Sequence, residues 1–137
     1  MEKIYSKVKP DILLHIINRK EDICKSRKDL SNEKEFLQIA TIPLSNGQTF
    51  KPHKHIFKKS ESRLVIAQES WIVIQGQVKC ILYDLDNQII AVRVLNQGDC
   101  SITFRGGHNY ECLQERTLVY EVKTGPYQGQ LLDKEMI

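Results

Sequence analysis

The chain has 137 residues, of which 41% are hydrophobic and 27% charged, as in an ordinary globular domain. That length allows one domain with one core, and it excludes a second catalytic domain. No apolar run approaches the roughly 18 residues of a transmembrane helix. The apolar stretch nearest the start is too short for a signal peptide. We therefore expect a cytoplasmic protein with no membrane partner.

The formal net charge of +3 is spread unevenly. Residues 1–63 hold 14 Lys and Arg against 8 Asp and Glu, whereas residues 64–137 hold 6 against 9. The basic residues alternate with acidic ones, which predicts a solvated surface and no nucleic-acid partner. The four cysteines contain no Cys-x-x-Cys pair, so we expect free thiols, with Cys80 buried inside an apolar run.

The first part of the chain lacks the residues that punctuate turns. Neither glycine nor proline occurs between Pro10 and Pro43, and all seven glycines lie from Gly47 onward. Residues 11–18 follow Pro10 and predict a short helix, and residues 20–35 predict a second helix or a loop. We therefore expect residues 1–35 to form a partly helical N-terminal extension.

From residue 36 the pattern becomes that of a sheet protein. Pro52 lies inside one extended segment, which we expect to be an edge or bulged strand. The sheet region is expected to end at Gly125-Pro126-Tyr127. The expected strands are residues 36–42, 49–57, 63–68, 71–74, 77–83, 89–95, 100–104, 109–113 and 117–122. Short strands at this spacing predict an all-β sandwich or barrel over residues 36–137.

The sharpest chemical feature is His53-Lys54-His55. Residues i and i+2 of a strand point to the same face, so the two imidazoles can share one metal ion. Gly47 precedes this motif by six residues, and Glu69 precedes Gly76 by seven. A further histidine, His108, follows the glycine-rich stretch of residues 105–107.

Together, Gly-x5-His-x-His, Glu-x6-Gly and the later Gly…Gly…His resemble the two sequence motifs of the cupin superfamily. The resemblance implies a cupin double-stranded β-helix, which is a jelly-roll barrel, preceded here by the short helical extension. It also implies four metal ligands, namely His53, His55, Glu69 and His108. Three imidazoles and a carboxylate suit a divalent ion such as Zn, Fe, Mn or Ni.

This sequence departs from the family pattern at two places. Thirteen residues separate His55 from Glu69 instead of three or four, and residues 56–63 read as a hairpin extension. Glu61, inside that extension, is a rival ligand, and we prefer Glu69 because its spacing to Gly76 fixes its place on a strand. The second motif lacks its proline and is one residue shorter. A jelly roll that binds a ligand without metal is the alternative.

A closer resemblance covers residues 36–137. The runs 69–84 and 105–110 and the ending 119–134 are similar to small cupin-fold metalloproteins of the WbuC type, encoded among bacterial surface-polysaccharide genes. This implies a sugar or nucleotide sugar as ligand and an isomerase- or epimerase-like reaction. The alternatives are a non-catalytic sugar- or metal-binding module and an Fe-dependent dioxygenase. Family resemblance also implies a homodimer, with residues 1–35 covering a sheet edge.

Other polar groups are expected near the metal. Arg105 could pair with a phosphate or carboxylate of a ligand, or could be a loop surface charge. Tyr110 shares the face of His108 and is either a proton donor or a tyrosine that fills the barrel. Trp71 shares the face of Glu69 and is read as core in preference to a platform for a sugar ring. Asn109 and Tyr127 are expected nearby.

Overall fold

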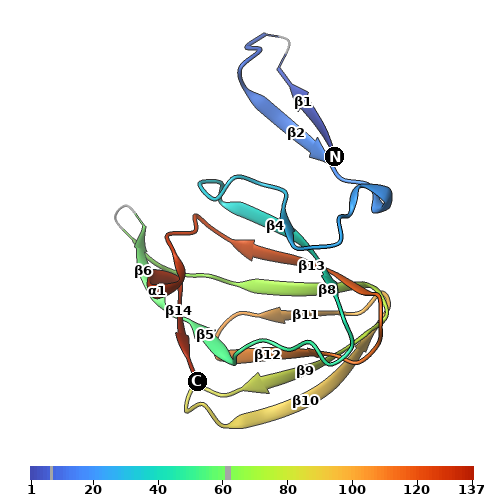
Figure 1. Cartoon of the computed structure of the whole chain (residues 1–137). Coiled ribbons are helices and arrows are strands. Elements are labelled where there is room, and N and C mark those ends of the chain that lie inside the picture. The colour runs from blue at the N-terminus through green and yellow to red at the C-terminus, as the bar shows by residue number, and fades with distance from the viewer. Residues whose placement is uncertain (7, 61–62) are drawn as a thin grey trace.

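Two five-stranded antiparallel sheets make up most of the computed structural model, which describes residues 1–6, 8–60 and 63–137 (Figure 1). In spatial order, the first sheet consists of β10 (Ile89–Asn96), β9 (Gln77–Tyr83), β12 (Gly107–Cys112), β5 (His53–His55) and β14 (Lys134–Met136). The second consists of β11 (Cys100–Thr103), β8 (Glu69–Gln75), β13 (Thr117–Thr124), β4 (Leu37–Leu44) and β3 (Lys28–Asp29). The all-β prediction for the main body is confirmed.

The core lies between the inner faces of the two sheets. Strands such as β8 and β9 alternate buried and partly exposed residues, as expected when one face packs inward. The buried cluster consists of Ile42, Leu44, Trp71, Val73 and Val119 from the second sheet and Val78, Cys80, Tyr110 and Cys112 from the first. Burying this apolar surface joins the two sheets into one unit.

The region around Pro52 differs from the prediction of an edge or bulged strand. The strand β5 begins at His53, after the proline, and lies between β12 and β14 inside the sheet. Because Pro52 precedes the strand, its missing N–H interrupts no ladder. Its carbonyl instead accepts a hydrogen bond from the Ile137 backbone N–H at 3.2 Å.

The end of the chain also differs from the prediction. The sheet does not end at residues 125–127, because α1 (Gln130–Asp133) leads into β14, which pairs with β5. Lys134 pairs with His55 and Met136 pairs with His53. The segment is too short for a periodic signal, and only its pairing with β5 makes it a strand.

The predicted helix over residues 11–18 is wrong. Residues 2–5 and 13–17 form the strands β1 (Glu2–Tyr5) and β2 (Leu13–Ile17), which pair as a hairpin. The run of leucines and isoleucines is short and favours a paired strand over an isolated helix. The only helical turn described in residues 1–35 is η1 (Lys20–Asp22). Figure 1 shows the β1–β2 hairpin standing apart from the two sheets.

The insertion after His55 forms a hairpin extension as predicted, but its second strand is residues 63–66, which were expected to belong to a separate strand over residues 63–68. Its strands are β6 (Phe57–Ser60) and β7 (Arg63–Ile66), which among the described residues form a two-stranded sheet of their own. The rival ligand Glu61 lies outside the described residues.

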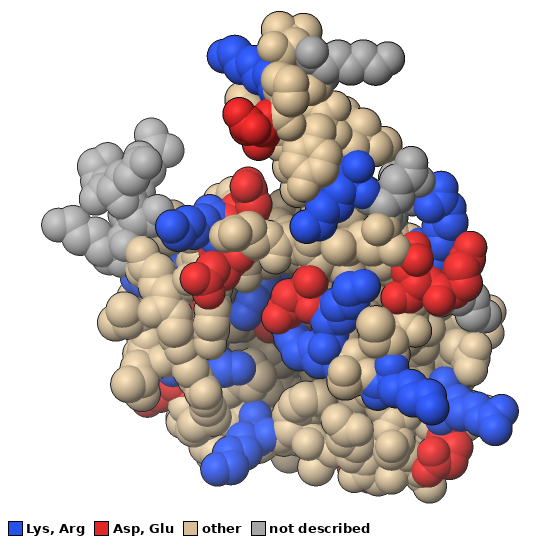
Figure 2. Space-filling model, turned by 45° about the horizontal axis from the view of Figure 1, so that its top comes forward, with Lys and Arg blue, Asp and Glu red and all other residues tan. Residues whose placement is uncertain are grey.

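The mixed surface charges and the free cysteines are as predicted from the sequence. Figure 2 shows Lys and Arg side chains interspersed with Asp and Glu side chains on one face of the molecule. All four cysteines are free, and Cys80 is buried as predicted. In the described part of the chain, the structure contains no helix with the length and apolar character needed to cross a membrane.

Candidate metal centre

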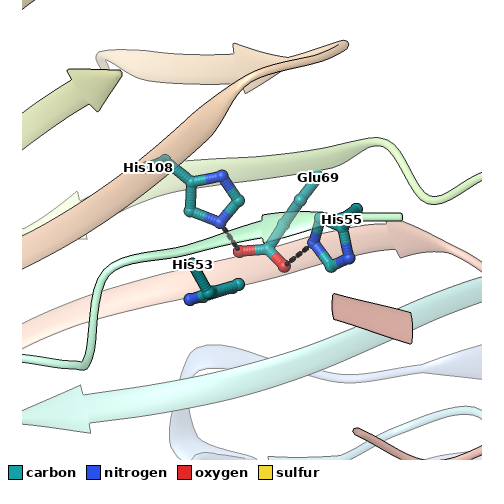
Figure 3. Close-up of side chains that lie close together, drawn as sticks. All are labelled: His53, His55, Glu69 and His108. Carbon is teal, nitrogen blue, oxygen red and sulfur yellow. Dashed lines mark hydrogen bonds and ion pairs between the residues drawn. The ribbon is translucent and has the colours of Figure 1, made fainter. Parts of the chain in front are cut away.

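Both sheets contribute side chains to one buried cluster. His53 and His55 lie on β5, and His108 lies on the adjacent β12, opposite His53. Glu69 begins β8 in the facing sheet and reaches across the barrel. Figure 3 shows the three imidazoles surrounding the Glu69 carboxylate. The structure thus brings together all four predicted ligands.

The four side chains are within reach of a single ion. One donor atom from each lies within 4.8 Å of the others, and all four residues are buried. The carboxylate of Glu69 lies between two imidazoles, with Oε2 at 3.2 Å from His55 Nε2 and Oε1 at 3.2 Å from His108 Nε2. The indole Nε1 of Trp71 also donates to Glu69 Oε1, at 3.1 Å.

His53 presents a free lone pair to the cluster. Its Nδ1 contacts the Lys51 carbonyl at 3.0 Å, so Nδ1 carries the proton and donates it. Burial lowers the pKa of His53 to about 4, which keeps the ring neutral at pH 7. Its Nε2 is buried and has no hydrogen-bond partner. A neutral imidazole with an unpartnered buried nitrogen is the form that binds a metal ion.

In the metal-free cluster, contacts between opposite charges favour the charged forms of Glu69 and His55. Burial opposes ionisation of Glu69, but its contacts with His108 and His55 hold its pKa well below the usual range. Burial also disfavours the charged form of His55, but hydrogen bonds to Asp133 and Glu69 outweigh it and raise the pKa of His55 to about 9. A metal bound here would take the place of the His55 proton. The donor set of three imidazoles and one carboxylate fits a divalent first-row ion.

Two residues beside the cluster were missed by the sequence reasoning. Asp133 Oδ2 lies 3.1 Å from His55 Nδ1, and the other Asp133 oxygen is ion-paired with Lys58. Asp133 follows the point where the sheet was expected to end, and Lys58 lies in the hairpin extension. No spacing rule connects either residue with His55.

Of the two predicted catalytic residues, Tyr110 is buried in the barrel and Arg105 is exposed. Tyr110 is buried, its ring stacks on Trp71 with centroids 4.0 Å apart, and its hydroxyl lies 2.8 Å from Ser101 Oγ. Burial raises the pKa of Tyr110, so its hydroxyl is a weaker acid than usual. Both observations favour a barrel-filling role. Arg105 is exposed, with its guanidinium 5.9 Å from the Phe57 ring centroid, and does not line the cavity beside the cluster.

That cavity has a volume of about 560 Å³. His53 and Glu69 line it together with Trp71 and Tyr110, so the cluster can be reached from it. Ile39, Ala40 and Phe50 add apolar surface, and charged and polar side chains line the rest: Arg27, Asp29, Ser31, Asn32, Glu33, Gln38, Glu121, Lys123 and Tyr127, with Lys134 from β14. Tyr127 is therefore near the site as expected, and Trp71 is both core and cavity wall.

The comparisons with known proteins identify the fold. Protein-family models and curated proteins give no match. The chain is similar to KdgF from Halomonas sp. (TM-score 0.57, 20% identity, 77% of this chain and 82% of that one). It is similar to an uncharacterised Klebsiella pneumoniae protein with a double-stranded β-helix domain (0.56, 17%, 75% and 78%). It also resembles an oxalate decarboxylase variant from Bacillus subtilis (0.61, 15%, 81%), but spans only 28% of that longer chain. This chain therefore has the double-stranded β-helix fold of the cupins, as its motifs predicted.

Proposed function

We propose that this protein holds a divalent metal ion at His53, His55, Glu69 and His108 and acts on a sugar or nucleotide sugar. The observation that carries the proposal is the convergence of four buried donors beside a largely polar cavity, with ring nitrogens of His53 and His108 that have no hydrogen-bond partner. A divalent ion held there would polarise a carbonyl or hydroxyl oxygen of the ligand. The WbuC-type resemblance supports a cytoplasmic isomerase or epimerase of bacterial surface-polysaccharide biosynthesis.

Two lysines beside the ligands support an anionic group on that substrate. In the sheet register, Lys123 on β13 lies directly opposite Glu69 on β8, and Lys134 on β14 lies directly opposite His55 on β5. Directly opposed residues share one face of a sheet, so both lysines belong to the ligand face, and both line the cavity. Neither has an ion pair among the described residues, whereas Arg27 is paired with Glu121 and Asp29. A phosphate or carboxylate on the ligand would complement these two charges.

We expect the metal-loaded protein to convert a nucleoside diphosphate sugar or a sugar phosphate, with new sugar signals in proton NMR spectra. Lys123→Met and Lys134→Met should each weaken ligand binding roughly tenfold, or about 1.4 kcal/mol. Lys9→Met, which changes an exposed lysine on the connection between β1 and β2, is the matched control and should change nothing. Equal binding by all three variants would remove the anionic-ligand proposal.

A non-catalytic binding module is the second candidate. It is favoured by the position of the two expected catalytic groups, because the Tyr110 hydroxyl is buried against Ser101 and Arg105 lies outside the cavity lining. Binding of the same sugars without turnover, for each of the four candidate metals, would favour the module over the enzyme.

We also propose a homodimer. The β1–β2 hairpin stands apart from the sheets, and an isolated two-stranded hairpin is marginally stable in water. Its strands and turn expose apolar side chains, including Tyr5, Val8 and Leu14, and contact with a second copy would cover them. We expect sedimentation equilibrium to give twice the 15.9 kDa chain mass. A monomer at micromolar concentration would contradict the proposal.

A further inference from the structure

The side of His55 that faces away from Glu69 is held by a buried carboxylate. Asp133 contacts His55 Nδ1 through its backbone carbonyl at 3.2 Å and through Oδ2 at 3.1 Å. The Asp133 side chain is 1% exposed, and α1 places it directly before β14. The backbone carbonyl accepts the Nδ1 proton and the negative charge of Oδ2 lies beside it, which fixes the proton at Nδ1 and turns Nε2 toward the other three ligands.

The second oxygen of that carboxylate is held by a buried lysine. Lys58 Nζ forms an ion pair with Asp133 Oδ1 and donates a hydrogen bond to the Pro126 carbonyl at 3.0 Å. Lys58 is only 6% exposed, which is unusual for lysine. Burying both charges is costly unless they are paired, and here Lys58 is paired with Asp133 Oδ1 while Asp133 Oδ2 faces His55 Nδ1 at 3.1 Å. The contacts therefore form one chain from Lys58 through Asp133 to His55.

The lysine comes from the segment in which this sequence departs from the cupin motif. Thirteen residues separate His55 from Glu69, and they include the hairpin strands β6 and β7. Lys58 lies on β6 and reaches the C-terminal segment beside the cluster. The hairpin therefore contributes a buried charge next to a candidate metal ligand.

We propose that Lys58 and Asp133 are positioning residues that orient His55 toward the metal ion, and that the β6–β7 hairpin serves to supply Lys58. The inference rests on the proposed metal centre. A histidine that binds metal through one nitrogen commonly donates the other N–H to a carboxylate, which fixes the ring and makes it a better ligand. Lys58 holds that carboxylate in place and balances its charge.

The test measures zinc affinity of the full chain by competition with a chromophoric chelator. Asp133→Asn should weaken zinc binding by about 10- to 100-fold, the usual effect of losing such a partner. Lys58→Met should weaken it roughly tenfold, and Lys58→Arg should restore most of the affinity because it keeps the charge. Lys54→Met is the matched control, because Lys54 lies on β5 between the two histidines but contacts Asn87 and Glu135 instead.

Two further readouts separate positioning from a merely structural role. The visible spectrum of the cobalt-loaded protein should change in Asp133→Asn and Lys58→Met, because the geometry at His55 changes, and should stay unchanged in Lys54→Met. Urea unfolding with a chelator present measures the stability of the metal-free variants. Lower stability with unaltered zinc affinity and cobalt spectrum would overturn the inference and leave the metal centre standing. Failure of the unmodified protein to bind zinc or cobalt would overturn both.

Discussion

Replacing His53 with alanine is expected to weaken binding of the divalent metal by more than about 100-fold, beyond the usual effect of an outer-shell partner. The unfolding free energy of the metal-free protein should fall by less than about 2 kcal/mol. Metal affinity should fall much more than stability because Nε2 of His53 is buried without a hydrogen-bond partner. It therefore contributes little to the unfolding free energy of the metal-free protein. Among the described residues, the one side-chain hydrogen bond lost is that of Nδ1 to the Lys51 carbonyl.

Isothermal titration with zinc and urea unfolding in a chelator measure the two effects separately. His15→Ala is the matched control, because His15 is an exposed histidine on β2, outside the cluster. It should leave metal affinity and metal-dependent turnover unchanged. If His53→Ala and His108→Ala both retained full zinc affinity, the assignment of the cluster as a metal centre would be wrong.

Replacing Trp71 with alanine is expected to lower the unfolding free energy of the metal-free protein by about 4 kcal/mol. Trp71 is 2% exposed, stacks on Tyr110 and meets the Phe50 ring edge-on with centroids 5.4 Å apart. Alanine would leave a cavity between the two sheets that the surrounding side chains only partly fill. Urea unfolding followed by far-ultraviolet circular dichroism gives the difference.

Trp71→Phe separates packing from hydrogen bonding at the same position. Phenylalanine keeps an aromatic ring beside Tyr110 but removes the Nε1 donor to Glu69. Since hydrogen bonds to charged groups contribute more than neutral ones, we expect a loss of about 2 kcal/mol. Equal stability of Trp71→Phe and the unmodified protein would show that this donor contributes nothing to holding the carboxylate.

The sequence predicted the candidate ligands because their signals are local or follow strand periodicity. His53 and His55 are two residues apart on one strand, and Trp71 shares the inward face of Glu69 as alternation requires. The glycine-based spacing placed Glu69 at the start of β8. Such signals depend on the backbone period and on turn residues, which the sequence carries directly.

The strands and contacts that the sequence did not predict depend on pairing with another segment of the chain. Residues 13–17 are a strand only because residues 2–5 pair with them, and β14 is a strand only because β5 lies beside it. The contact of Asp133 with His55 joins positions 78 residues apart, and no periodicity relates them. The 3.6-residue and two-residue periods were ambiguous over the short apolar run before Asn18, so the helix prediction there failed.

Anomalous diffraction from crystals grown with zinc, recorded at the zinc edge, tests directly whether the four candidate ligands hold a metal ion. We expect one strong peak per chain, about 2.0 to 2.2 Å from a nitrogen of each of His53, His55 and His108 and from a Glu69 oxygen. An empty position between these four side chains, with zinc bound elsewhere on the protein or not at all, would contradict this expectation.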